Sequence, residues 1–314
     1  MITAKVILDS ISPEGIRLTT LQLRYPRMVH ADFMTHRVFS RNGRSSRAVP
    51  FATLVNEEPY VPEFGRNQSG MVAAETPFSD TEQAVAQQIW WRAAKACQEA
   101  AQELADVGVH KQWVNRMLEW FGYIDVLVTS TEWANFFALR DEAGAQPEIQ
   151  ELARAMKVAM EGSTPNKLQV GQWHLPYITE EDDKLIHAYF TESWTRQTGE
   201  HEDSMPLTPQ CPEWIEIKRK VSVARCARLT IKPFDGDGSI KKELKRFELL
   251  MVSRPVHSSP AEHVATPAQY NKGPRLDYTG NGTYAKGVWF NKAEWGNYFG
   301  WRQFRKMIPH NTVY

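Results

Sequence analysis

The chain has 314 residues, and its 37 Lys and Arg are balanced by 37 Asp and Glu. Zero net charge disfavours a protein that coats nucleic acid or binds a membrane through a polybasic surface. No run approaches the roughly eighteen apolar residues of a membrane span, and the N-terminus MITAKVILDS lacks the apolar region of a signal peptide. The three cysteines lack metal-ligand spacing, so we expect no metal site and no disulfide scaffold, but a reducing, cytoplasmic setting.

The first predicted element is a β-hairpin within the first 25 residues. The runs AKVILDSIS and IRLTTLQLRYP are rich in residues that favour strands, and Pro13-Glu14-Gly15 between them is typical of a turn. An apolar run follows at 28–34. We expect residues 28–37 to form a further strand that pairs with the hairpin in one sheet.

Helical patterns dominate the rest of the chain. Ser79 and Glu82 form a capping-box pattern, apolar residues then recur at helical spacing as far as Leu104, and Gly108 ends the helix. The predicted class is α+β with helices dominant. Further helices are expected at 113–120, at 132–139, from Pro147 onward, near 180–195, at 213–229 and at 238–252.

The segment 36–47, HRVFSRNGRSSR, differs in character from its surroundings. It holds four Arg together with Ser and Asn side chains. Hydroxyl groups and guanidinium forks suit phosphate oxygens. Clustered Arg also repel one another unless an anion lies among them. On composition alone, a solvated basic loop or an arm that contacts nucleic acid explains the segment equally well.

The spacing within this segment resembles the signature of the flavin-dependent thymidylate synthases, Arg-His-Arg-x7-Ser. Here His36 and Arg37 are followed after seven residues by Ser45, with Asn42 and Arg47 also in place. The preceding run TLQLRYPRMVHADFM resembles the strand that leads into that signature. Two further blocks of the chain extend the resemblance.

The second block lies at 113–150. WVNRML places Arg116 where the family has an Arg for the nucleotide phosphate, and EWANFFALRDEAGAQPEIQ resembles a family segment of the form N-F-x-x-L-R followed by A-Q-x-E-I-Q. The resemblance implies that Asn135 contacts the flavin and that Arg140 lies at the uracil edge. Without the resemblance, Arg140 is an Arg at a helix C-terminus, favoured there by the helix dipole.

The third block lies at 221–263. VSVARCARLT resembles the family's helix of small residues that ends in Ser or Thr, here Thr230. HSSPAEH at 257–263 resembles the family's flavin-binding motif H-x-[ST]-P-F-E-H. A metal role for this motif is disfavoured, because a Pro separates its His and Glu residues and their spacing does not match zinc ligands on one helix face.

The blocks occur in a different order from the family, in which the H-x-[ST]-P-F-E-H block precedes the His-Arg block. Three matches in swapped order indicate a circular permutation, which a fold can tolerate when its termini lie close together at the surface. The resemblance implies one domain over residues 1–314, with helices packed on an antiparallel sheet. The segments 52–78, 161–212 and 266–314 have no counterpart and are interpreted as insertions or extensions.

The resemblance implies reductive methylation of dUMP to dTMP, with methylenetetrahydrofolate, FAD and NADPH. It also implies a homotetramer, in the cytoplasm of the cell or, for a viral member, of the host. Such a site needs cations that hold a phosphate and polarise the pyrimidine, not an enzyme nucleophile. The implied catalytic residues are Arg140 and Ser45; the substrate-binding residues are Ser45, Arg47, Arg116 and Arg140; the flavin-binding residues are His36, Arg37, Val38, Asn135, Thr230, His257, Ser259 and Glu262.

The chain departs from the family pattern at several positions. Thr35 replaces the first Arg of the signature, Gly43 replaces an acidic residue, and Gly144 replaces a His. Thr129 and Thr131 stand where the family often has Asn and Arg. Because these changes fall largely on flavin contacts, they predict that FAD is retained weakly.

Two alternatives to methylation remain open. In the first, water intercepts an exocyclic methylene intermediate, and dUMP or dCMP gains a hydroxymethyl group. In the second, from another class, the 36–47 arm serves a non-catalytic nucleic-acid-binding protein, against which the zero net charge counts. A cysteine nucleophile is disfavoured, because Cys97 and Cys226 are predicted to lie in the core and nothing near Cys211 would activate its thiol.

Overall fold

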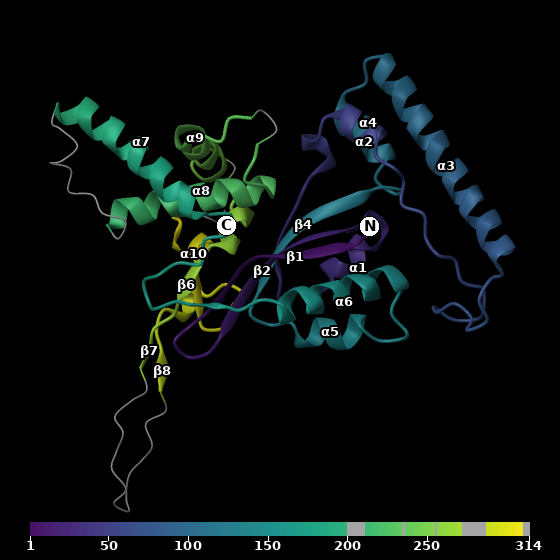
Figure 1. Cartoon of the computed structure of the whole chain (residues 1–314), viewed down its shortest axis with the longest axis horizontal. Helices are drawn as coiled ribbons and strands as arrows, with labels where there is room; N and C mark the ends of the chain where they lie inside the picture. Colours follow the sequence, from purple (N-terminus) through teal and green to yellow (C-terminus); the bar gives the residue numbers. More distant parts are fainter. Residues whose placement is uncertain (200–210, 234–235, 255, 272–286, 310–314) are drawn as a thin grey trace, which may run out of the picture.

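The computed structural model describes residues 1–199, 211–233, 236–254, 256–271 and 287–309. At its centre is a five-stranded sheet in the order β3-β4-β2-β1-β5 (Figure 1). Neighbouring strands are antiparallel except β1 and β5, so the expected α+β class with a mainly antiparallel sheet is confirmed. The strands are β1 (Thr3–Ile11), β2 (Arg17–Pro26), β3 (Ser40–Gly43), β4 (Tyr123–Ser130) and β5 (Asn166–Lys167).

Helices and short strands surround this sheet, and none of the described helices is both long and apolar enough to cross a membrane. The first half of the chain contributes η1 (Arg27–Val29), α1 (His30–Met34), η2 (Ser46–Ala48), α2 (Phe51–Val55), α3 (Asp80–Asp106), α4 (Lys111–Met117), α5 (Ala134–Arg140) and α6 (Pro147–Glu161). The second half contributes α7 (Glu180–Thr198), α8 (Pro212–Arg228), α9 (Ile240–Met251), η4 (Ser259–His263), β6 (Ala265–Pro267), β7 (Tyr270–Asn271), β8 (Val288–Trp289), η5 (Lys292–Glu294), β9 (Trp301–Gln303) and α10 (Phe304–Met307).

The predicted hairpin is confirmed. β1 and β2 pair antiparallel over most of their length, and Gly15 in the turn between them has a φ of +79°, a backbone conformation that glycine adopts without steric cost. On one face of the sheet, Leu21 and Leu23 of β2 share a buried cluster with Phe136 of α5 and Ile149 of α6. Strand residues two apart share a face, so the alternation of β2 places these side chains against the helices.

The opposite face of the sheet is covered by the second half of the chain. Leu127 of β4 packs there with Tyr177, Cys226 and Leu229, and η4 lies against β3. Cys226 is buried as predicted, and burial raises the pKa of its thiol. The third block therefore packs against β3, the strand within the signature segment, although the two are far apart in the sequence.

The expected strand at 28–37 is wrong. β2 ends at Pro26, and the chain then continues as η1 and α1. Val29 and Phe33 are both buried in the main cluster, and residues four apart share one face of a helix. The apolar run therefore marks the buried side of one helical turn.

The strand that joins the hairpin in the sheet is instead β4, which sequence reasoning missed. β4 pairs with β2 on one side and with β3 on the other, and Val126 to Ser130 are buried. Its run YIDVLVTS is rich in β-branched residues, which was an available strand signal.

Helix α3 begins with the predicted capping box, in which Ser79 and Glu82 bond to each other's main-chain N–H groups. The helix runs along one edge of the molecule, away from the sheet (Figure 1). Its buried residues are two alanines. Val85 and Ile89 are 53 % and 55 % exposed, and Cys97 is half-buried instead of lying in the core as predicted.

Candidate functional site

The signature segment runs from the turn after α1 through β3 to η2. His36 is buried, and its ring packs against Phe39 and Phe136. Its Nε2 accepts a hydrogen bond of 3.1 Å from Nε of Arg140. Arg140 also donates to the hydroxyl of Thr35 at 3.2 Å. The sequence-predicted His36 and Arg140, 104 positions apart, are therefore in direct contact.

The environment of His36 favours its neutral imidazole. Burial lowers its pKa, and the guanidinium groups of Arg140 and Arg41 lower it further, because a positive ring beside them is unfavourable. A neutral ring can accept the hydrogen bond from Arg140, whereas a protonated ring has no acceptor nitrogen. Within the described residues no carboxylate pairs with Arg140, so its positive charge is available to a ligand.

Two of the four Arg in the segment have structural partners. Arg41 donates to the main-chain oxygens of Met34 and His36 at 2.7 and 3.0 Å, and Arg44 pairs with a carboxylate of β4 at 2.7 Å. Arg37 and Arg47 are exposed, and the described part of the chain holds no partner for either. These two are the Arg that the resemblance assigns to ligands.

The residues assigned to the nucleotide phosphate lie on neighbouring segments. Asn115 of α4 donates from Nδ2 to the main-chain oxygen of Ser46 at 2.8 Å, which fastens η2 to α4. Glu119 accepts a hydrogen bond from the Ser46 hydroxyl and lies 3.6 Å from the guanidinium of Arg116. The turn at 45–47 and the helix that carries Arg116 are thus joined. The assigned residues are Ser45, Arg47 and Arg116.

The third block meets the signature at Asn42. Ser259 of η4 donates from Oγ to Oδ1 of Asn42 at 3.2 Å. The Nδ2 of Asn42 donates to the main-chain oxygens of Cys226 and Ala227, near the end of α8, at 3.0 and 3.3 Å. One side chain of the signature therefore joins both parts of the third block. His257, just before η4, is exposed.

Glu262 is already engaged by the C-terminal segment. Its carboxylate forms an ion pair with Arg305 of α10, and its main-chain oxygen accepts a hydrogen bond of 2.6 Å from the hydroxyl of Tyr298. Asn297 in the same segment donates to the main-chain oxygen of Val38 at 2.9 Å. Part of the 266–314 segment therefore packs on the candidate flavin residues. No local sequence pattern pointed to these contacts, because they depend on the tail folding back.

A buried chain of hydrogen bonds underlies these groups. Ser10, His174, Thr20, Thr129 and His263 are joined in that order by contacts of 2.6–2.8 Å. Burial lowers the pKa of each histidine to about 3. Thr129, one of the departures from the family, links the sheet to η4. Sequence reasoning missed this chain, although polar residues within three buried strands were a signal for it.

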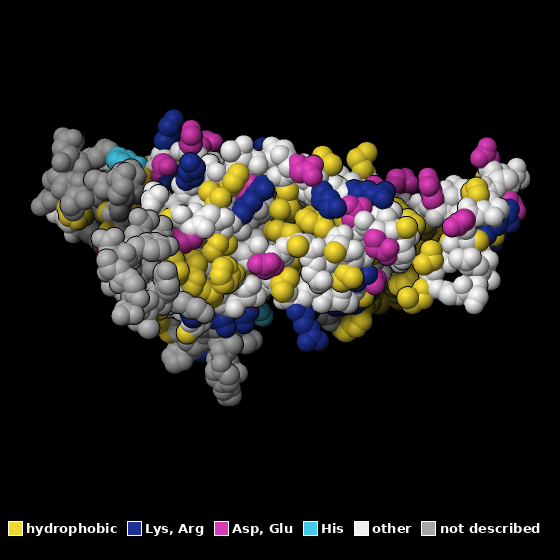
Figure 2. Space-filling model, turned by 90° about the horizontal axis from the view of Figure 1, so that it is seen from below, with side chains coloured by type: hydrophobic (Ala, Val, Ile, Leu, Met, Phe, Trp, Pro, Cys, Tyr) yellow, Lys and Arg dark blue, Asp and Glu magenta, His cyan; other side chains and the backbone are white. Residues whose placement is uncertain are grey.

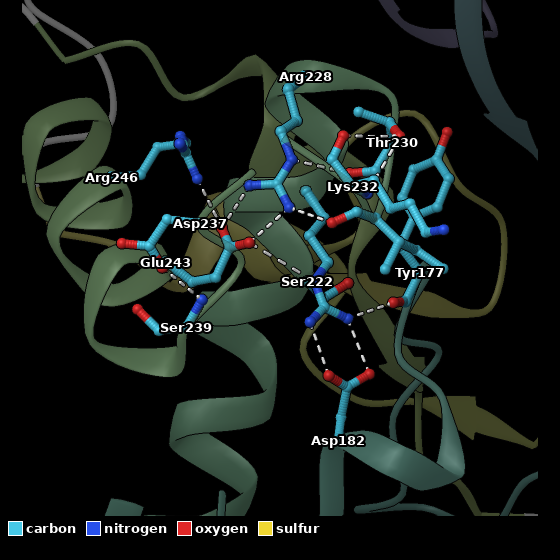
Figure 3. Close-up of polar contacts among 12 residues, drawn as sticks. Tyr177, Asp182, Ser222, Arg228, Thr230, Lys232, Asp237, Ser239, Glu243 and Arg246 are labelled. Carbon is cyan, nitrogen blue, oxygen red and sulfur yellow. Dashed lines mark hydrogen bonds and ion pairs between the residues drawn. The ribbon is translucent and has the colours of Figure 1, made fainter. Parts of the chain in front are cut away.

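Thr230 lies in the turn after α8, beside a cluster of ion pairs (Figure 3). Arg228 donates to its main-chain oxygen at 2.9 Å and pairs with Glu243 of α9. The Thr230 hydroxyl bonds to the main chain of Lys232 at 3.2 Å. Its hydrogen-bonding capacity is therefore partly used within the turn. Of the remaining assigned residues, Val38 is 44 % exposed and Asn135 is also exposed.

Comparisons with known proteins agree with part of this picture. A protein-family model described as thymidylate synthase complementing protein matches residues 16–166, just under half of the chain. Among curated protein sequences, none matches the chain. Among solved structures, the chain is similar to the crystal structure of a UMP/dUMP methylase, PolB, from Streptomyces cacaoi bound with 5-Br UMP. That match has 19 % identity and a TM-score of 0.41, and covers 51 % of this chain and 88 % of the other.

Proposed function

We propose that this chain, which belongs to the thymidylate synthase complementing protein family through residues 16–166, is a flavin-dependent thymidylate synthase that methylates dUMP reductively to dTMP. Membership of the family makes it an enzyme of one-carbon transfer to a pyrimidine nucleotide. The identity of the group transferred, the cofactors and the residues that hold them are our inference from the site.

The observation that carries the proposal is the contact between His36 and Arg140. The neutral imidazole and the Thr35 hydroxyl hold two nitrogens of the guanidinium, and no described residue bonds to its NH1. A guanidinium fixed in this way can donate to a pyrimidine carbonyl and stabilise negative charge as it develops on the ring. Because no carboxylate among the described residues neutralises its charge, none of them offsets this stabilisation.

The phosphate of dUMP would be held by the second set of residues. Arg47 is exposed without a partner in the described chain, and Ser45 and Arg116 lie on segments that Asn115 joins. A hydroxyl and two guanidinium groups on adjoining segments can surround a phosphate with charge-assisted hydrogen bonds.

The exposed polar groups fit a flavin nucleotide. Arg37, Asn135 and His257 are all exposed, and their side chains form no hydrogen bond or ion pair with described residues. A bound FAD would supply the hydride, with NADPH as its reductant and methylenetetrahydrofolate as the one-carbon donor. Arg37 would meet the pyrophosphate, and Asn135, His257 and Ser259 would orient the rest of the cofactor. Glu262 would also contact the cofactor, from its position in the ion pair with Arg305.

We further propose a homotetramer and a permuted family domain over the whole chain. The permutation is supported by the contact of η4 with β3 and by the Ser259–Asn42 hydrogen bond. Oligomerisation is supported by α3, whose apolar residues are largely exposed in the single chain.

A nucleic-acid-binding arm is less consistent with the contacts of the signature segment. Arg41 and Arg44 are used internally, which leaves Arg37 and Arg47 to meet a phosphate backbone. The face in Figure 2 shows basic and acidic side chains interspersed, without a continuous basic surface. Binding through phosphates depends on many such cations acting together.

The test is an anaerobic incubation of the protein with FAD, NADPH, methylenetetrahydrofolate and either dUMP or dCMP, followed by mass spectrometry of the nucleotide. We expect a methyl group on dUMP; a hydroxymethyl product would assign the chain to the alternative reaction. Arg140→Ala should abolish product, whereas Arg154→Ala, which removes an ion pair between α6 and Asp141 at the end of α5, should not. Unchanged nucleotides together with no binding of FAD would contradict the proposal.

A further inference from the structure

A cleft of about 660 Å³ opens on the face of the sheet that the second half of the chain covers. Strands β1 and β2 form one wall, and the turn after α8 forms another. We refer to it as the sheet cleft. Of the residues that the sequence assigns to ligands, Thr230 lines it and the others do not.

The charged groups of the sheet cleft are mainly cationic: Lys5, Arg24, Arg44, Arg228 and Lys232 face one carboxylate, Asp125. The three Arg are already paired, two of them with Asp125 at 3.3 and 2.7 Å and Arg228 with Glu243. In the described chain no carboxylate pairs with Lys5 or Lys232. Two ammonium groups, one from each wall, are therefore free to bind an anion.

The wall formed by the second half of the chain is held in a strained conformation. Tyr177 and Leu229 line the cleft with φ values of +64° and +59°, in a region unfavourable for side chains with a Cβ. Arg225 of α8 donates to the main-chain oxygen of Tyr177 at 2.7 Å, and the Tyr177 hydroxyl donates to Gln22 of β2 at 3.0 Å. These contacts fix the wall before any ligand arrives, which lowers the ordering cost of binding.

Figure 3 shows Thr230, Lys232 and Tyr177 together on the side of Arg228 that faces away from Glu243. The ion pair between Arg228 and Glu243 thus holds the turn after α8 on α9, and Lys232 lies on the other side of that turn. The apolar residues Val6, Ile7 and Ile231 also belong to the lining of the cleft. A lining that combines apolar side chains with a few charged groups is typical of sites for small organic ligands.

We propose that the sheet cleft is a second anion site, which binds the phosphate of a nucleotide between Lys5 and Lys232. The choice of a nucleotide rests on the proposed function, since dUMP, FAD and NADPH all carry phosphate. The shared chemistry is a phosphate attached to a ring system that lies on the apolar lining.

The test is isothermal titration of inorganic pyrophosphate, dUMP, FAD and NADPH into the full chain and into the double variant Lys5→Gln/Lys232→Gln. Lys245→Gln, an exposed Lys of α9 that is not part of the cleft, is the matched control. Both cleft lysines are exposed, so the double variant is expected to keep the parent melting temperature. We expect it to bind at least one of the three nucleotides tenfold or more weakly than the control.

The nucleotide that loses affinity identifies the source of the phosphate. If no nucleotide binds the double variant at least tenfold more weakly than the control, the inference is overturned, whatever pyrophosphate does. The experiment measures binding and is independent of turnover. A protein that makes no dTMP can still lose nucleotide affinity in the double variant, and an active synthase can keep its nucleotide affinity there.

Discussion

Among single residues, Asn42 makes the most connections between the parts of the candidate site. It bonds to Ser259 and to two main-chain oxygens near the end of α8. Asn42→Ala removes all three contacts and leaves the carbonyls without their donor, so we expect a loss of about 1–3 kcal/mol in the free energy of unfolding and weaker retention of FAD. Urea denaturation and flavin absorbance after gel filtration measure both.

The matched control is Asn56→Ala, in which an exposed side chain loses one bond to its own helix. If Asn42→Ala resembles this control in both measurements, Asn42 does not join the blocks as the structure indicates.

The pair of His36 and Arg140 predicts a titration that differs from that of an ordinary histidine. Burial, Arg140 and Arg41 all lower the pKa of His36, so its neutral form stabilises the fold above pH 6.5 and this contribution is lost as the pH falls.

In Arg140→Ala the positive charge beside His36 is removed, and the pKa of His36 should rise toward 6.5. NMR titration of the ring protons checks this, with Arg154→Ala expected to match the parent. A parent value at or above 6.5 would contradict it.

At the scale of elements, helices α7, α8 and α9 are joined by buried charges. Asp182 in the first turn of α7 pairs with Arg225 of α8 through two contacts of 2.6 and 2.7 Å, and both side chains are buried. Asp182→Ala leaves the buried guanidinium with only the more distant carboxylate of Glu243, at 3.7 Å, and also removes the cap of α7. We expect a loss of about 3–5 kcal/mol in the free energy of unfolding.

The surface pair of Arg196 and Glu192 in the same helix provides the comparison. Arg196→Ala should cost less than about 1 kcal/mol. Equal urea midpoints for the two variants would show that the buried pair does not hold the helices together.

The hydrogen-bonded chain that links the sheet to η4 predicts acid sensitivity. The pKa values of His174 and His263 are lowered to about 3 by burial, so both residues bind protons more readily in the unfolded chain. Stability is then complete above pH 6.5 and falls with decreasing pH, by about 1.4 kcal/mol per pH unit for each histidine. Urea midpoints between pH 7.5 and 5 measure this, in a range where carboxylates stay ionised.

His263→Asn should reduce the pH dependence of the free energy of unfolding by about 1.4 kcal/mol per pH unit. One buried group then no longer titrates, while His174, His36 and His30, whose pKa values are also lowered, still do. A midpoint that stays constant from pH 7.5 to 5 in the parent protein would contradict the burial of both histidines.

At the scale of the whole molecule, helix α3 leaves several apolar side chains exposed to water. A helix with Val85 and Ile89 more than half exposed leaves apolar area in water, which association of subunits would remove. Val85→Glu/Ile89→Glu should therefore shift the protein from the proposed homotetramer to smaller species in light scattering, with little effect on the fold of each subunit. Val158→Glu on α6, also at an exposed position, should leave the mass unchanged; a parent protein that is monomeric at every concentration would contradict the proposal.

The sequence by itself determined the features that depend on nearby residues. Gly15 and the runs around it specify the hairpin, and Ser79 with Glu82 specifies the start of α3, because turns and caps are formed by contacts within a few residues. The spacing from His36 to Ser45 pointed to the family whose model matches residues 16–166.

Tertiary structure alone decided which residues distant in the sequence come into contact. The run at 28–34 became helical because Val29 and Phe33 can then both enter the core beneath the sheet, a preference set by packing and not by local propensity. Of the four Arg in the signature segment, Arg41 and Arg44 have structural partners. Arg37 and Arg47, which the family resemblance assigns to ligands, have none among the described residues. Lys5 and Lys232 line one cleft because the second half of the chain folds back over the first strands, a contact that no local pattern encodes, since it is stabilised by apolar area buried between distant segments.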